Sequence, residues 1–322
     1  MNRVLKVVLA LAAVGAAFPS SSADRRVGFS AEGDFSEETI RRGVVATSEQ
    51  CSKVSNAVWA STKEHGSECI KYWASGFSGR TTQKAVVFFH GDVWLGPGKT
   101  NRAYLQQSST KVQQSADNWS RRLAAPYIFI GRPGTYGSSG DHMQRRRPAE
   151  SLLLSAALDK IREKLKIKEL VVAGQSGGGH VTSSLITHRN DIVCAVPTSA
   201  PSSPRVRWTM KGLTKDTTGY RDSYEPSEHL GKAGVNKSLR VFVLGNPNDT
   251  NVVWPSQTIM ADQLKKAGIP VATLEGEGTD PDAHGLRDSA HKVAGWCFHV
   301  CRPTRLFERR RRACAASVTL QS

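Results

Sequence analysis

A serine, an aspartate and a histidine, each just after an apolar run, have the side chains needed for nucleophilic catalysis. Ser176 lies in Gly174-Gln175-Ser176-Gly177-Gly178, and Asp249 and His284 follow later in the chain. A serine hydroxyl is a weak nucleophile until a base takes its proton. The imidazole of His284 can be that base, and the carboxylate of Asp249 can fix its tautomer and stabilise the imidazolium. The three residues predict acyl transfer through a covalent intermediate on Ser176.

The segment around Ser176 has the layout of a nucleophile elbow. An apolar, partly β-branched run at 169–173 leads into Gly-x-Ser-x-Gly, and a helix-compatible segment follows. Side chains at Gly174 and Gly178 would collide with the neighbouring strand and helix. An ordinary glycine-rich turn is the alternative, because a bare Gly-x-Ser-x-Gly match is common by chance. The flanking strand and the order Ser, Asp, His favour the elbow.

A tetrahedral intermediate on the serine needs backbone donors for its negative oxygen, each worth roughly 3 kcal/mol. The N–H of Gly177, one residue after the nucleophile, is one candidate. The loop His90-Gly91-Asp92-Val93 follows an apolar run and predicts a second donor, the N–H of Asp92. The Asp92 side chain must then point away, since a carboxylate facing the oxyanion would oppose it.

Other acids and histidines compete for these roles. Asp280 and Asp282 lie near His284 in sequence, but they are typical of loop acids that cap a turn. His142 and His180 could touch substrate, yet neither has the position of the base. Asp249 and His284 therefore stay the predicted partners of Ser176.

The elements that must position these residues alternate along the chain. Apolar runs predict strands and amphipathic segments predict helices; the strands are expected at 57–64, 68–75, 84–89, 126–130, 169–173, 192–196, 239–244 and 269–274, and the helices at 101–123, 148–166, 177–188, 255–267 and 286–300. This alternation predicts an α/β fold, with a mostly parallel sheet and helices on both faces. Loops at the carboxyl ends of such strands meet at one edge, where sites gather. Residues 201–238 are expected to form a cap-like excursion, and 24–50 give no clear element.

The two ends of the chain differ in composition from the middle. Residues 1–23 combine the basic Arg3 and Lys6, an apolar run and a small-residue site near Ala23. These features predict a cleaved secretory signal and a secreted or periplasmic protein, with a retained anchor as the alternative. Residues 24–301 are expected to form one α/β domain, and 302–322 a basic, disordered tail. No later run is long and apolar enough to predict a transmembrane segment.

The net charge of +16 over 322 residues could indicate a nucleic-acid partner. Six of the basic residues, however, lie in the tail and three form Arg145-Arg146-Arg147, and no aromatic residues interleave with them. We therefore expect no nucleic-acid binding. A basic exported protein that meets anionic surfaces accounts for the charge.

Six cysteines are compatible with disulfides in an exported protein. Cys51 with Cys69 is the favoured pair, because it would staple the N-terminal segment. Cys194 lies in an apolar run and is predicted to be a buried thiol. Cys297 could pair with Cys301 or with Cys314. A metal site at Cys297, His299 and Cys301 is not expected, because no second ligand pair has suitable spacing.

Several motifs together resemble the α/β hydrolase superfamily over about residues 84–296. In its prolyl oligopeptidase and dienelactone hydrolase-like group, Gly-x-Ser-x-Gly-Gly is followed by a Tyr-x-Pro-Ser type segment, a strand ending before an acid, and a late histidine. Here these are similar to 174–179, Tyr224-Glu225-Pro226-Ser227, the 246–252 segment with Asp249, and His284. The acid loop is one residue longer than usual, and no propeller precedes the domain.

The resemblance implies a serine hydrolase of ester, thioester or amide bonds that needs no cofactor and no metal. We expect an exported carboxylesterase acting on a small-molecule ester. A small peptidase or amidase, and a non-catalytic ligand-binding relative, are the alternatives. The substrate pocket is expected to include Val93, Trp94 and Tyr136 beside the 201–238 segment. Neither the substrate nor the oligomeric state follows from the motifs.

Overall fold

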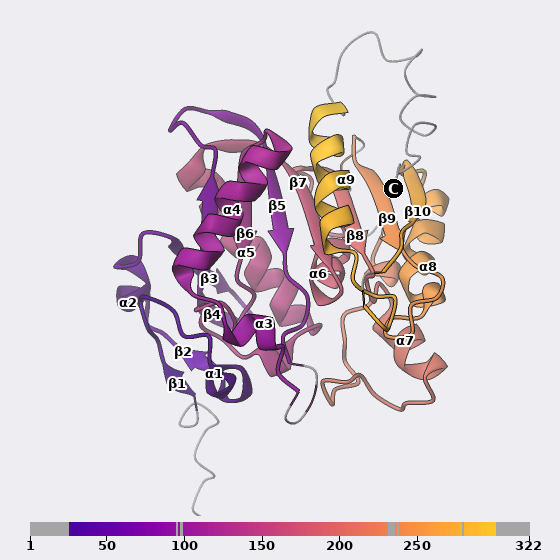
Figure 1. The fold of residues 1–322 in the computed structure, drawn as a ribbon, viewed down its shortest axis with the longest axis horizontal. Helices are drawn as coiled ribbons and strands as arrows, with labels where there is room; N and C mark the ends of the chain where they lie inside the picture. The colour runs from indigo at the N-terminus through magenta and orange to yellow at the C-terminus, as the bar shows by residue number, and fades with distance from the viewer. Residues whose placement is uncertain are drawn as a thin grey trace, which may run out of the picture.

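The computed structural model describes residues 26–300, apart from 95, 97, 98, 231–235, 237 and 279. The predicted signal (1–23) and tail (302–322) lie outside the described residues. An eight-stranded sheet forms the centre, in the order β10-β9-β8-β7-β5-β6-β4-β3 (Figure 1). Its strands are β3 (Ala57–Thr62), β4 (Gly66–Ser75), β5 (Thr82–Phe89), β6 (Tyr127–Ile130), β7 (Ile167–Gln175), β8 (Ile192–Thr198), β9 (Arg240–Gly245) and β10 (Val271–Glu275).

The strands from β10 to β6 run parallel, whereas β4 is antiparallel to both β6 and β3. The predicted mostly parallel sheet is confirmed. Strand β5 shows why an unbroken apolar run forms a central strand: its side chains alternate between two cores. Ala85, Val87 and Phe89 pack into one core, and Val86 and Phe88 pack into the other.

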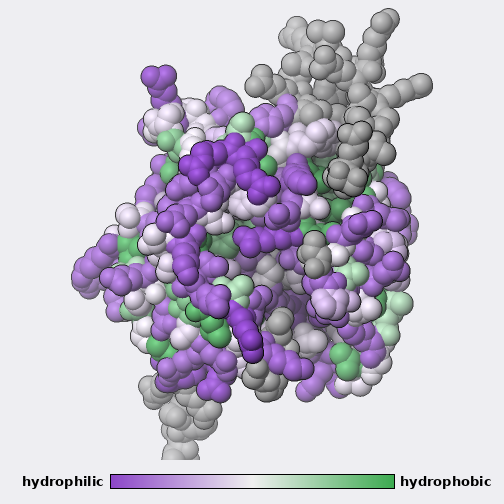
Figure 2. All heavy atoms as spheres, viewed as in Figure 1, coloured by the Kyte–Doolittle hydropathy of each residue, from purple (hydrophilic) through white to green (hydrophobic). Residues whose placement is uncertain are grey.

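Helices cover both faces of the sheet, as the alternation predicts. The first face carries α4 (Ser109–Leu123) and α9 (Arg287–Val300), which lie in front of the sheet in Figure 1. The second carries α5 (Pro148–Leu165), α6 (Gly177–Leu185) and α8 (Trp254–Lys266). Most of the surface on the α4 and α9 side is hydrophilic, with small scattered apolar patches (Figure 2). Within the described chain, no helix has the length and apolarity to cross a membrane.

The 101–123 segment forms two helices where one was predicted. Helix α3 (Arg102–Leu105) ends before a break, and the Ser108 hydroxyl then accepts the N–H of Lys111 at the start of α4. A side chain that caps a new helix offers the backbone an alternative to continuing the old one. The break between α3 and α4 therefore comes from the capping Ser108, and the spacing of apolar residues along 101–123 does not reveal it.

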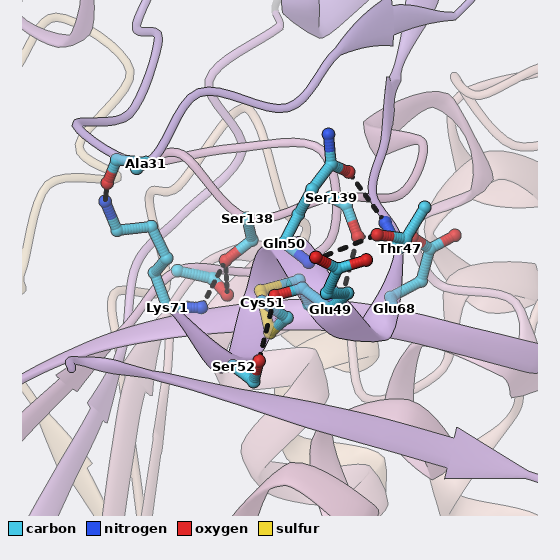
Figure 3. The surroundings of a disulfide bond; sticks show 12 residues. Ala31, Thr47, Glu49, Gln50, Cys51, Ser52, Glu68, Lys71, Ser138 and Ser139 are labelled. Atoms are coloured by element: carbon cyan, nitrogen blue, oxygen red, sulfur yellow. Dashed lines mark hydrogen bonds between the residues drawn. A yellow bond between two sulfur atoms is a disulfide. The ribbon is translucent and has the colours of Figure 1, made fainter. Parts of the chain in front are cut away.

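The N-terminal segment contains elements that the sequence did not indicate. They are β1 (Val27–Gly28), α1 (Glu37–Arg42), β2 (Val44–Val45) and α2 (Ser48–Ser52). Strands of two residues and helices of five or six are too short for a periodic signal. The predicted Cys51–Cys69 disulfide is confirmed and joins α2 to β4 (Figure 3). Beside it, the N–H of Cys69 donates to the Ser139 hydroxyl at 2.7 Å.

The prediction for Cys194 was wrong. Cys194 is fully buried in β8, but its sulfur is bonded to Cys297 in α9, 103 residues away. The two meet because α9 packs across the face of β7 and β8, a contact between distant segments that spacing along the chain cannot reveal. This bond also replaces the predicted pairing of Cys297 with Cys301 or Cys314, both of which lie outside the described residues.

Candidate active site

Ser176 occupies a strained turn between a strand and a helix. β7 ends at Gln175, α6 begins at Gly177, and Ser176 between them has φ 58° and ψ −121°. A non-glycine residue at such angles costs on the order of 1–3 kcal/mol and persists only where its surroundings impose it. The glycines have the predicted steric role: a Cβ on Gly174 would lie 2.3 Å from the Gly178 carbonyl oxygen, and one on Gly178 would lie 2.1 Å from the Phe89 carbonyl oxygen.

Asp249 and His284 come together from loops that follow neighbouring strands. Asp249 follows β9, His284 follows β10, and the His284 Nδ1 lies 2.7 Å from the Asp249 Oδ2. The other oxygen, Oδ1, accepts the N–H groups of Asn251 and Val252, both at 2.8 Å. A carboxylate can only accept from these groups, which assigns the proton of neutral His284 to Nδ1 and leaves a lone pair on Nε2. Nε2 is buried and has no hydrogen-bond partner among the described residues.

The backbone of His284 is held on both sides by side chains. Its carbonyl oxygen accepts the Gln175 amide at 3.1 Å and the Ser199 hydroxyl at 2.8 Å. Its N–H donates to the Asp280 carboxylate at 2.7 Å, so Asp280 caps the turn as the sequence predicted. Asp282, predicted to cap a turn as well, instead accepts the Thr250 hydroxyl at 3.1 Å and joins the His284 loop to the Asp249 loop. Sequence reasoning missed the part played by Gln175 and Ser199, because nothing along the chain links them to residue 284.

A buried glutamine completes the surroundings of Asp249. The Gln257 amide nitrogen donates to the Asp249 Oδ2 at 3.0 Å and to the Val252 carbonyl at 2.6 Å. Because both partners can only accept, the amide orientation is determined. Gln257 lies in α8, and a glutamine in a helix is typical of a surface residue. In the structure its side chain is fully buried.

Ser176 and His284 share one cleft of about 520 Å³. The cleft also contains the other predicted pocket residues, Asp92, Val93, Trp94 and Tyr136. Asp249 lies behind His284, with its side chain fully shielded from solvent. Within the described residues, His, Cys, Asp and Glu side chains form no cluster suited to hold a metal ion.

The pocket residues differ in how they are held. The N–H of Val93 donates to the His142 Nε2 at 3.4 Å, which gives that histidine a structural role at the edge of the cleft. Burial lowers the pKa of His142 well below its ordinary value, so the ring is neutral. Tyr136 lies in an aromatic cluster with Phe129 and Tyr104, and its N–H donates to the Tyr104 hydroxyl. These contacts hold Val93 and Tyr136 at the lining of the cleft that also contains His284.

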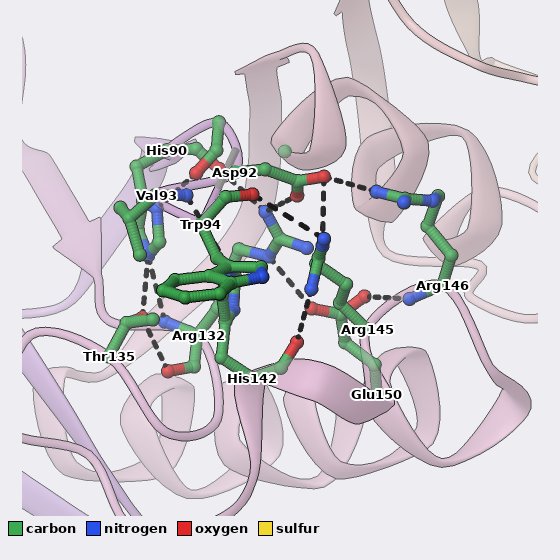
Figure 4. Close-up of polar contacts among 12 residues, drawn as sticks. His90, Asp92, Val93, Trp94, Arg132, Thr135, His142, Arg145, Arg146 and Glu150 are labelled. Atoms are coloured by element: carbon green, nitrogen blue, oxygen red, sulfur yellow. Dashed lines mark hydrogen bonds and ion pairs between the residues drawn. The ribbon is translucent and has the colours of Figure 1, made fainter. Parts of the chain in front are cut away.

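The Asp92 carboxylate is the centre of a buried ion cluster (Figure 4). Arg132 Nη1 lies 2.9 Å from its Oδ1, Arg145 Nε lies 3.0 Å from its Oδ2, and Arg146 Nη1 also contacts Oδ2. The carboxylate packs against Gly177: a Cβ on that glycine would lie 2.0 Å from Oδ1. The side chain was predicted to point away from the oxyanion; the carboxylate instead lies beside Gly177, one residue after the nucleophile, and guanidinium groups offset its charge.

Two further carboxylates complete this cluster. Glu150 pairs with Arg132 at 2.8 Å, and Asp216 pairs with Arg146 at 2.6 Å. The set of three acids and three arginines is neutral overall. Burial would raise the pKa of the Asp92 carboxyl, but the arginines hold it well below its usual range. The sequence showed Arg145-Arg146-Arg147 only as a basic run, because the acidic partners lie far away along the chain.

The remaining histidines near the elbow are not bases. Burial lowers the pKa of His90 to about 3, and its Nε2 accepts the N–H of Arg132 at 3.2 Å. His180 lies on α6, where its Nε2 donates to the Tyr224 carbonyl at 2.9 Å, and burial lowers its pKa to about 4. As predicted from the sequence, neither His142 nor His180 takes the position of His284.

Comparison with known proteins adds evidence about the fold. The structure is similar to Est1E from Butyrivibrio proteoclasticus, solved with ferulic acid bound, with a TM-score of 0.52 and 12% identity over 75% of this chain and 98% of that one. It is also similar to the Pyrococcus furiosus esterase Pf2001, with a TM-score of 0.52 and 13% identity over 81% of this chain and 98% of that one. The match to prolyl oligopeptidase B from Galerina marginata has a TM-score of 0.51 and 12% identity, over 75% of this chain and 36% of that one.

Neither a protein-family model nor a curated protein sequence matches the chain. The structural similarities confirm the predicted α/β-hydrolase fold, the scaffold of the esterases and peptidases named above. At these identities they establish the fold alone, and function has to be argued from the site itself.

Proposed function

We propose that the chain is a serine hydrolase that cleaves carboxylic esters through an acyl-enzyme on Ser176. The observation that carries the proposal is the His284–Asp249 pair at 2.7 Å, whose unpartnered Nε2 lies in the same cleft as the strained Ser176. A base with its lone pair free, in the same cleft as a half-buried serine hydroxyl, provides the groups that nucleophilic catalysis requires.

The proposed reaction has two steps. In the first, the Ser176 Oγ attacks the ester carbonyl carbon while the His284 Nε2 takes the hydroxyl proton. The C–O bond to the alcohol then breaks, and Nε2 returns the proton to the leaving oxygen. In the second, water attacks the acyl carbon with Nε2 again as base, and Ser176 is released with a carboxylic acid. Asp249 stabilises the imidazolium in both steps, and the N–H groups of Gly177 and Asp92 stabilise the oxyanion.

An ester is favoured over an amide on two grounds. Similarity to two free-standing esterases extends over 98% of their chains, whereas similarity to the oligopeptidase extends over 36% of that protein. Among the described residues of the cleft, Asp92 is paired with arginines, and Asp280 and Asp282 already accept hydrogen bonds, so no carboxylate is set apart for the free amino terminus of a peptide. A small peptidase shares the mechanism and is the second candidate.

We also propose that the protein is exported, with 1–23 as a cleaved signal, 24–301 as the catalytic domain and 302–322 as a separate tail. The support is the composition of 1–23 together with two disulfides, which persist in oxidising compartments.

A fluorophosphonate label tests the catalytic proposal directly. The native protein should form one adduct on Ser176, located by peptide mass spectrometry, and should release nitrophenol from 4-nitrophenyl butyrate. Ser176→Ala should lose the adduct and reduce kcat by about 10⁴-fold or more. Ser61→Ala, on the exposed side of β3, is the matched control and should keep both.

A folded native protein that neither labels nor turns over any ester would favour the non-catalytic relative. Faster cleavage of aminoacyl anilides than of short acyl esters would favour the peptidase.

A further inference from the structure

One half-buried arginine in the cleft differs in its partners from the buried arginines of the Asp92 cluster. Arg207 lies on α7 (Pro204–Met210), in the predicted cap-like excursion, and lines the same cleft as Ser176. Its Nε donates to the Asn251 carbonyl at 3.1 Å, its Nη2 to the Asn251 side-chain oxygen at 2.6 Å, and its Nη1 reaches the Thr217 hydroxyl only at 3.5 Å. All three acceptors are neutral, and Nη1 has the weakest partner.

Among the described residues, no carboxylate lies within ion-pair distance of Arg207. Each arginine of the Asp92 cluster, by contrast, contacts at least one carboxylate, and that cluster is neutral as a set. Asp216 and Asp92 are therefore already balanced by Arg132, Arg145 and Arg146. Arg207 is the cation of the cleft interior whose charge has no dedicated partner.

The electrostatic surroundings of Arg207 agree with its lack of a carboxylate partner. Burial, and then repulsion by Arg146, lowers the pKa of Arg207 to about 10, although Asp216 partly offsets them. The side chain stays protonated at neutral pH. A partly desolvated cation is costly to keep unless an anion compensates it, and a bound ligand can supply that anion.

Apart from Arg207 and the neutral Asp92 cluster, the charged residues of the cleft are exposed. Arg287, Asp280 and Asp282 line the cleft but are exposed, so water and salt screen them. They are of mixed sign, and both acids already accept hydrogen bonds in the His284 loop. Arg207 is therefore the charge on the cleft that is neither exposed nor paired with a carboxylate of the described residues.

We propose that the cleft selects esters that carry a carboxylate, and that Arg207 is the residue that binds this carboxylate. The inference rests on the proposed esterase function and names its substrate class. The guanidinium group can donate two parallel hydrogen bonds to a carboxylate, a geometry that Lys cannot reproduce, although Lys keeps the charge. The substrate would thus be bound by its anionic group at Arg207 and cleaved at Ser176.

Matched pairs of substrates isolate the contribution of the substrate carboxylate to kcat/KM. 4-Nitrophenyl hydrogen succinate and 4-nitrophenyl butyrate have acyl groups of equal chain length and differ by a carboxylate in place of a methyl group. Acetylsalicylate and phenyl acetate form a second pair, with the carboxylate on the alcohol side. The measured quantity is the ratio of kcat/KM for the anionic ester to that for its neutral counterpart. A ratio within one variant cancels any general loss of activity caused by the substitution.

In Arg207→Gln the ratio should fall at least tenfold for one of the two pairs, and which pair responds tells whether the anion belongs to the acyl or the alcohol part. Arg207→Lys should retain an intermediate ratio. Arg205→Gln is the control, because Arg205 lies on the same helix but pairs with Glu228 and does not line the cleft. Its ratios should equal those of the native protein.

The proposal is overturned if both ratios in Arg207→Gln stay within twofold of the native values, or if Arg205→Gln lowers them equally. Failure of the esterase function itself looks different: the native protein would then cleave neither neutral ester, and Ser176 would take no fluorophosphonate label.

Discussion

At the scale of single residues, the site depends on charges that the reaction does not use. The Asp92 carboxylate contacts three buried guanidinium groups, while its backbone N–H is a proposed oxyanion donor. A buried charge fixes its segment because moving it would break several ion pairs at once. The cluster thereby holds the loop after β5 in place against the elbow at Gly177.

Replacing Asp92 by Asn should therefore affect both stability and turnover. The loss of one partner leaves uncompensated buried arginines, which we expect to lower the free energy of unfolding by about 3–5 kcal/mol. The loop would also lose its anchor, so kcat should fall at least tenfold with little change in KM. Urea unfolding and ester hydrolysis measure the two effects.

Asp216→Asn is the matched comparison, since Asp216 is at least as buried as Asp92 and faces the same Arg146. It should destabilise the fold but reduce kcat less, because it does not touch the oxyanion loop. Equal kcat in Asp92→Asn and the native protein would contradict the anchoring role.

The sequence indicated the residues of the proposed chemistry more readily than the residues that hold them. Ser176, Asp249 and His284 each follow a strand, so topology alone brings them to one edge of the sheet. Gln257 and Asp216 gave no such signal. Their roles depend on pairwise contacts between distant segments, and polarity along the chain does not encode those contacts.

At the scale of elements, the turn from β7 to α6 works only because three backbones pass close together. The Gly178 Cα faces the Phe89 carbonyl of β5, which leaves no room for a side chain. The strained φ of Ser176 is imposed by this packing.

Gly178→Ala should force the strand and helix apart. We expect it to lower the free energy of unfolding by about 1–3 kcal/mol, the usual effect of overpacking, and to slow fluorophosphonate labelling of Ser176. Gly28→Ala is the control, because a Cβ there would meet nothing within 4 Å. Labelling of Gly178→Ala at the native rate would show that the elbow tolerates the displacement.

Long elements were predictable and short ones were not. Helix α5 shows a proline in its first turn and leucines along one face, and it forms close to the predicted bounds. Helix α7 spans seven residues inside a polar segment, and its sequence has no apolar stripe to reveal it. This short helix nevertheless carries Arg207, so the part of the cleft proposed to select the substrate was the part least visible in the sequence.

At the scale of the whole molecule, several histidines are buried in neutral form. Burial lowers the pKa of His90 to about 3 and those of His180 and His188 to about 4, and it takes the pKa values of His142 and His291 well below the ordinary range. Unfolding would release these rings to an ordinary pKa near ~6.5. Below that pH the unfolded chain binds protons that the folded chain does not.

The stability contributed by these rings is thus complete above about pH 6.5 and is lost as the pH falls toward 4. The free energy of unfolding from urea titrations should decrease by more than about 1.4 kcal/mol per pH unit in this range, the slope of a single proton. His180→Gln should reduce that slope by up to about 1.4 kcal/mol per pH unit, the contribution of one proton. A stability that stays level between pH 7 and pH 5 would contradict the burial of neutral imidazoles.

The Cys194–Cys297 bond has a consequence for the integrity of the chain. It closes a loop that contains Asp249 and His284, whereas Ser176 precedes it. A protease that cuts once between the two cysteines, for example in the 201–238 excursion, produces no separate fragments while the bond is intact. The nucleophile and its two partners stay on one covalently connected molecule, and the cleaved protein migrates as a single species until a reductant is added.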